Sequence, residues 1–220
     1  MIYHRFLAAL VAGLCLFSGA TSAATLSARA TAGVDLQARL KEVEHDPKLS
    51  ESLFKMGSKV AAVCDSCHGQ GGNSHRTDIP NLASQNPAYH LEQLRQYAIG
   101  QRHDPFMEGM IKAMNSDEKV GMVMFYATQK VTRKPIQNAA LVTRGKVLYE
   151  SACQQCHDEE GHGDEKLARI AGQQPVYLNV ALKRYRAGAG TRLDARMAAN
   201  TKKMTDADID ALVAYTMSLQ

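Results

Sequence analysis

Two copies of the pattern Cys-x-x-Cys-His constrain this chain more than any other feature. On one helical turn, residues i and i+3 share a face, so both thiols can form thioethers to one side of a porphyrin. The residue at i+4 then places an imidazole beneath the iron. The pattern therefore predicts two covalently bound haem c groups, with the cysteines as attachment points and the histidines as iron ligands. The residues concerned are Cys64, Cys67 and His68 in the first copy, and Cys153, Cys156 and His157 in the second.

Paired cysteines also occur in two other kinds of site. Four thiolates can close a structural zinc site, and two vicinal pairs can form disulfides in an oxidising compartment. Neither alternative requires a histidine directly after both pairs, so the haem interpretation is favoured.

The first 24 residues have the layout of a secretory signal peptide. His4 and Arg5 precede an apolar run from Phe6 to Ala20, and small residues follow up to Ala24. The run is about 15 residues long, shorter than the roughly 20 that a spanning helix needs. Cleavage would also remove Cys15, which lies outside both motifs. We therefore predict export to the periplasm, and leave open a retained leader or a peripheral association with the membrane.

An internal repeat accompanies the two motifs. Cys64 and Cys153 are 89 residues apart, and further identities recur at offsets of 88 to 90. We predict a first haem domain over residues 48–130, a linker over 131–140 and a second haem domain over 141–220. Residues 25–47 form an N-terminal extension, which we expect to be an extra helix, with a partner-binding arm as the alternative. The matched pairs include Gln85/Gln173, Pro87/Pro175, Tyr89/Tyr177, Leu94/Leu182, Tyr97/Tyr185 and Gly100/Gly188.

The pattern of each repeat is all-α. Helices are predicted to lead into the motifs, over roughly Ser50–Cys64 and Leu141–Cys153, and to follow Pro87 and Pro175. The last helix of each repeat begins with a capping residue and an acid three positions on. Domains of about 80 residues are marginal on core size alone, and only 6% of the residues are aromatic. A buried porphyrin would supply the missing apolar mass.

Methionines are the predicted distal iron ligands. Met107 and Met197 follow their proximal histidines by 39 and 40 residues, so they occupy equivalent places in the two repeats. A thioether is a soft axial ligand that raises the haem potential. Met110 is the rival in the first repeat. Four histidines are alternatives without counterparts in the other repeat, namely His75, His90, His103 and His162.

From about Lys48 to the C-terminus, the chain resembles the dihaem cytochromes c of the c4 type. In the first repeat the resemblance is carried by Gly72-Asn-Ser, Pro80-Asn-Leu-Ala-Ser-Gln85, the Gly100-x-Arg102 turn and Met107-Glu-Gly-Met110. In the second it is carried by Ile170-Ala-Gly-Gln173, Tyr177, Gly188 and Met197. The resemblance implies two tandem class I cytochrome c domains, both with histidine and methionine ligands, and it favours Met107 over Met110.

One position departs from the pattern of this family. Pro80 stands where the loop proline of the family accepts, through its carbonyl, a hydrogen bond from the proximal imidazole. Ala168 occupies the corresponding position of the second repeat. An alanine carbonyl can accept the same bond, so we expect the second ligand to be kept.

Charge and resemblance together define the expected function. The balance of 26 basic against 22 acidic residues gives no indication of nucleic-acid binding. The resemblance implies an electron carrier rather than an enzyme, moving single electrons between respiratory complexes. The expected donor is a cytochrome bc1 complex or another donor, and the expected acceptor is a haem-copper terminal oxidase. The alternatives are a dihaem redox enzyme, such as a thiosulfate dehydrogenase or a peroxidase-like protein, and an electron-relay subunit of a larger enzyme.

Overall fold

The computed structural model describes residues 35–132, 134–135, 138–188, 190, 192 and 194–219. The predicted signal peptide and residues 25–34 of the predicted extension lie outside the described residues. Within the described ranges the regular structure is helical and contains no strand, which confirms the all-α prediction.

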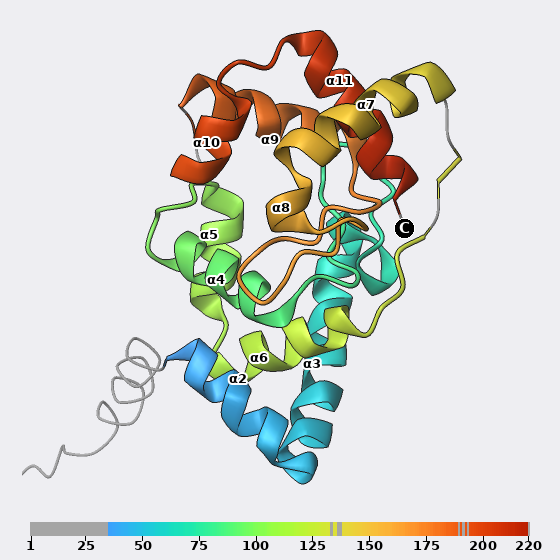
Figure 1. Cartoon of the computed structure of the whole chain (residues 1–220). Helices are drawn as coiled ribbons and strands as arrows, with labels where there is room; N and C mark the ends of the chain where they lie inside the picture. Colours follow the sequence, from blue (N-terminus) through green and yellow to red (C-terminus); the bar gives the residue numbers. More distant parts are fainter. Residues whose placement is uncertain are drawn as a thin grey trace, which may run out of the picture. The chain divides into compact units, whose positions relative to one another are not determined.

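The helices fall into two similar series that follow the sequence repeat (Figure 1). One helix, α2 (Leu36–His45), precedes the first series. The first series comprises α3 (Pro47–His68), the 3-10 turn η1 (Gln70–Gly72), α4 (Pro87–Ala98), α5 (Pro105–Ala113) and α6 (Ser116–Ala127). The second comprises α7 (Ala139–Ala152), α8 (Gln154–His157), α9 (Pro175–Ala187), α10 (Ala195–Thr201) and α11 (Asp206–Ser218).

The last helix of each series begins with the predicted cap. In α6, Asn115 accepts from the backbone N–H of Glu118, whose side chain accepts in return from the backbone of Asn115. Thr205 and Asp208 form the same reciprocal pair at the start of α11. Each capping box satisfies backbone donors that have no partner within the helix, so these starts are fixed locally by sequence.

The first and last helices of each series pack at very close range, α3 on α6 and α7 on α11 (Figure 1). A Cβ atom added to Gly57 of α3 would lie 2.0 Å from the backbone of Gly121 in α6. A Cβ on Gly145 of α7 would lie 2.0 Å from the carbonyl oxygen of Ala211 in α11. Only a residue without a side chain allows these backbones to approach so closely.

Each series has its own buried core. Leu91, Val120, Val123 and Tyr126 are buried in the first series, and the second series buries two clusters beside its own cavity, which include Tyr149, Ile209 and Leu212. The two fully buried tyrosines, Tyr126 and Tyr149, donate their hydroxyls to the main-chain carbonyls of Ala61 and Asp158 respectively. Burial of these rings therefore leaves no hydroxyl unpaired.

Helix α2 adds to the core of the first series. Leu40 and Val43 are buried in that core, and the Gln37 side chain donates to the carbonyl of Ala88 at 2.7 Å. Arg39 forms two hydrogen bonds with Asp117 at the start of α6, at 2.8 and 3.1 Å. In the part of the chain that the structure describes, α2 is a docked helix. No helix there is long and apolar enough to cross a membrane.

Candidate haem sites

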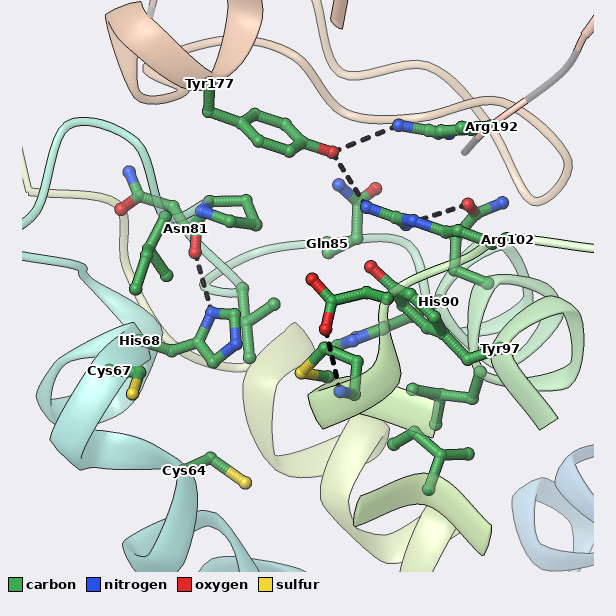
Figure 2. Close-up of a pocket in the computed structure, with 18 of the residues that line it drawn as sticks. Cys64, Cys67, His68, Asn81, Gln85, His90, Tyr97, Arg102, Tyr177 and Arg192 are labelled. Atoms are coloured by element: carbon green, nitrogen blue, oxygen red, sulfur yellow. Dashed lines mark hydrogen bonds between the residues drawn. The ribbon is translucent and has the colours of Figure 1, made fainter. Parts of the chain in front are cut away.

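The three residues of each motif lie together at the edge of a cavity. Helix α3 continues through the first motif, so Cys64, Cys67 and His68 lie at its C-terminal end, and Figure 2 shows the three side chains extending from this end of the helix. In the second repeat the helix breaks at Cys153, and α8 carries Cys156 and His157. Both sets line their own cavity.

The ring of each motif histidine is held by one hydrogen bond. The Nδ1 atom of His68 donates to the carbonyl oxygen of Pro80 at 2.9 Å, and Nδ1 of His157 donates to that of Ala168 at 2.9 Å. A bond at Nδ1 fixes the tautomer and leaves Nε2 free to bind a metal. The alanine carbonyl thus makes the bond that the sequence led us to expect.

Burial sets the charge state of these groups. It lowers the pKa of both His68 and His157, so each imidazole is neutral at pH 7, which is the ligating form. Burial also raises the pKa of the Cys64 thiol, and that of Cys153 to about 11. These cysteines are therefore neutral thiols rather than free thiolates before attachment.

The predicted distal methionines occupy equivalent places in short capped helices. The backbone N–H of Met107 donates to the Asp104 carboxylate at 3.0 Å, and that of Met197 donates to Asp194 at 3.1 Å. Met107 lines the cavity of His68, and Met197 lines that of His157. Other methionines also line these cavities: Met110, Met114 and Met122 in the first, and Met204 in the second. The structure therefore places each predicted histidine and methionine pair at the same cavity. Their assignment as iron ligands stays a prediction.

The four alternative histidines differ in their burial and in whether they line a cavity. His90 lines the first cavity and is only 6% exposed, and its Nδ1 atom has no hydrogen-bond partner among the described residues. His75 is exposed, and His162 is half-buried at the second repeat. His103 lines the mouth of the first cavity, with its side chain 63% exposed, and pairs with Glu108. The residue equivalent to His90 in the second repeat is Leu178.

The two cavities share a wall that sequence reasoning did not predict. Figure 2 shows the Tyr177 hydroxyl accepting from Arg102 and Arg192, each at 3.1 Å. Burial alone would raise the pKa of Tyr177, but the two guanidinium groups more than offset it and lower this pKa. Arg192 also donates to Tyr89. Two repeat matches are a sequence signal for this wall: Tyr89 with Tyr177, and Arg102 with Arg192, which lies 90 positions later.

The side chains present fit a covalently bound haem. Two thiols and one oriented, neutral imidazole face each cavity, as thioether attachment and axial ligation require. Neither Arg102 nor Arg192 pairs with a carboxylate of the described residues, and the buried Nε of Arg169, at the second cavity, has no partner there. Such cationic groups are suited to the propionate groups of a porphyrin.

The alternative uses of the cysteines find no support in the geometry. All four thiols are free. Across the described ranges no cluster of three or more His, Cys, Asp or Glu side chains is arranged to hold a bare metal ion. The four cysteines therefore form neither one zinc site nor two disulfides in this structure.

Comparison with known proteins gives consistent similarities. Residues 142–220 match the family model described as Cytochrome c. The cytochrome c4 of Pseudomonas aeruginosa is 29% identical over 175 residues, which cover 74% of this chain and 87% of that protein. A protein of Thiomonas intermedia named thiosulfate dehydrogenase electron acceptor is 29% identical, with 70% of this chain and 77% of that protein covered.

A solved structure is similar along both repeats. The crystal structure of reduced recombinant cytochrome c4 from Pseudomonas stutzeri superposes with a TM-score of 0.70 at 27% sequence identity. The match covers 76% of this chain and 98% of that one. The similarity therefore extends beyond one motif to the tandem arrangement.

Proposed function

We propose that this chain, which is similar to the dihaem cytochromes c4 along both repeats, is a periplasmic carrier that passes single electrons from a respiratory donor to a haem-copper terminal oxidase. Each covalently bound haem c supplies a one-electron ferric/ferrous couple. The protein would supply attachment points, axial ligands and a cavity lined mostly by apolar surface.

The equivalence of the two cavities is the observation that supports a carrier rather than an enzyme. Each has a neutral histidine fixed through Nδ1 and a methionine on a capped helix. If the histidine and the methionine filled both axial positions, the iron would have no open position for a substrate or oxygen. We propose attachment through Cys64, Cys67, Cys153 and Cys156, with His68 and Met107, and His157 and Met197, as the axial pairs.

The shared wall supports electron exchange between the two sites. Gln85, Tyr89, Gln173, Tyr177 and Arg192 line both cavities. Haems bound in two cavities that share these lining side chains could exchange an electron without a mobile intermediate. One molecule can therefore accept an electron at one repeat and release it from the other.

A reconstituted reaction tests this proposal. Purified oxidised protein should be reduced by a cytochrome bc1 complex supplied with quinol, and the reduced protein should be reoxidised by membranes that contain a haem-copper oxidase, in a cyanide-sensitive manner. Turnover of thiosulfate or of hydrogen peroxide by this chain alone would contradict the carrier proposal. We also expect the signal peptide to be cleaved after Ala23 or Ala24, which N-terminal sequencing of the periplasmic protein would test.

A second candidate donor is favoured by one relative. The Thiomonas intermedia protein is named as an electron acceptor of thiosulfate dehydrogenase, so a sulfur-oxidising dehydrogenase is the alternative source of electrons. Stopped-flow reduction by a thiosulfate dehydrogenase with thiosulfate, compared with reduction by bc1 and quinol, distinguishes the two donors. Reduction by thiosulfate without the dehydrogenase would instead indicate an enzyme.

A further inference from the structure

Two glutamines form reciprocal hydrogen bonds between the repeats. The Gln173 side chain accepts from the backbone N–H of Asn81 at 2.7 Å and donates to the Asn81 carbonyl at 3.1 Å. In the other direction, Gln85 accepts from the backbone N–H of Arg169 at 2.8 Å and donates to its carbonyl at 3.0 Å. Both glutamines are buried. Each repeat thus inserts the same side chain into the same loop of the other.

These bonds end on the peptide groups that orient the proximal histidines. The N–H of Asn81 belongs to the peptide whose carbonyl is that of Pro80, the acceptor of His68 Nδ1. The N–H of Arg169 belongs to the peptide of the Ala168 carbonyl, the acceptor of His157 Nδ1. A single peptide group therefore separates each histidine from a glutamine of the opposite repeat.

Such a chain of hydrogen bonds is cooperative. When a peptide N–H donates to an amide oxygen, its carbonyl becomes a stronger acceptor, and burial in a medium of low dielectric increases the effect. A stronger acceptor at Nδ1 makes the imidazole a more basic iron ligand. A more basic axial ligand stabilises the ferric state and lowers the haem potential.

We propose that Gln173 and Gln85 are positioning residues that each set the potential of the haem in the opposite repeat. Gln173 acts on the first haem through the Pro80 peptide, and Gln85 acts on the second through the Ala168 peptide. The inference rests on the proposed axial roles of His68 and His157. It couples the two redox sites without any contact between a glutamine and its target histidine.

Hydrogen bonds elsewhere between the repeats provide a control for the general effect of weakening this interface. Asn86 donates from its side chain to the carbonyls of His162 and Leu167, at 2.9 and 2.8 Å. Neither carbonyl belongs to the peptide that accepts from a proximal histidine. Removal of the Asn86 side chain weakens the same interface. It leaves intact the hydrogen bonds that run from each glutamine through a peptide group to the proximal histidine.

The test is a redox titration of each haem in Gln173→Leu, Gln85→Leu and Asn86→Ala, followed by the NMR signals of the haem methyl groups. Gln173→Leu should raise the midpoint potential of the first haem and leave the second unchanged. Gln85→Leu should do the reverse, and Asn86→Ala should leave both unchanged. If Gln173→Leu is not isolated with two haems, Gln173→Asn, which is too short to reach Asn81, takes its place.

A second readout separates this inference from the proposed ligation. In the reduced protein, a histidine bound to haem iron has ring protons strongly shifted by the porphyrin. If His68 and His157 lack such shifts, the proposed axial roles fail. If the shifts are present, Gln173→Leu should move the Nδ1–H signal of His68 upfield, as for a weaker hydrogen bond. Equal potential shifts of both haems, a shift only in the same repeat, or no shift would overturn the inference.

Discussion

At the scale of single residues, each site depends on which histidine nitrogen and which methionine sulfur are available to bind the haem iron. His68 and His157 each donate a hydrogen bond from Nδ1 to a main-chain carbonyl, which leaves Nε2 available to bind the iron. The distal side is less restricted, because several methionines line the first cavity. The sequence repeat, rather than a contact, selects Met107 and Met197.

Removal of a distal methionine should open one iron to an exogenous ligand. We expect the reduced Met107→Ala protein to bind carbon monoxide at one haem per molecule, and Met197→Ala to do so at the other. Met110→Ala is the matched control and should bind none, like the unaltered protein. Carbon monoxide binding by Met110→Ala but not by Met107→Ala would reassign the first distal ligand.

His90 should make the folded protein sensitive to acid. Burial is the main cause that lowers the pKa of His90 to about 3, with a smaller contribution from the positive charge of Arg102, whereas the unfolded chain titrates near pH 6.5. Between these values the unfolded state binds a proton that the folded state does not, so stability falls as the pH falls. At about pH 4.5 this single group should cost about 2 to 3 kcal/mol of unfolding free energy relative to pH 7.

Denaturant unfolding at the two pH values checks this effect. His90→Leu, which copies Leu178 of the second repeat, should lose less stability than the unaltered protein between pH 7 and about pH 4.5. His75→Leu replaces an exposed histidine and should change that loss little. An equal loss in the unaltered protein and in His90→Leu would show that His90 is not the acid-sensitive group.

At the scale of helices, each repeat is closed by one crossing of its first and last helix. Gly57 meets Gly121 there, and Gly145 meets Ala211 at the equivalent place. The capped starts of α6 and α11 follow from local sequence and were predicted. The crossings were not, because a lone glycine in a helical pattern does not reveal which backbone approaches it.

Filling this crossing should separate the two helices. Gly145→Ala would place a methyl group 2.0 Å from the Ala211 carbonyl oxygen, and overpacking of this kind costs about 1 to 3 kcal/mol. Gly109→Ala in α5 is the control, because a Cβ there meets nothing within 4 Å and alanine favours a helix by up to about 1 kcal/mol. Thermal unfolding that shows Gly145→Ala to be as stable as Gly109→Ala would disprove the close crossing.

At the scale of the whole molecule, the sequence predicts the two haem sites. It does not predict the hydrogen bonds that join the two repeats. The motifs at Cys64 and Cys153 predicted two haems because attachment needs only five consecutive residues. Gln85, Gln173 and Tyr177 were visible as repeat matches, but their bonds join residues more than 70 positions apart. Such contacts depend on how two helical units pack, which a local pattern does not encode.

The central claim is that both haems have a histidine and a methionine as axial ligands and therefore carry electrons without binding substrate. Its most direct test is the absorption spectrum of the purified, oxidised protein, normalised per haem, in the far-red region where a methionine sulfur on ferric haem gives a weak band. We predict the full intensity of two methionine-ligated haems. Intensity for one haem or for none would contradict the claim, and would favour a redox enzyme with an open iron site.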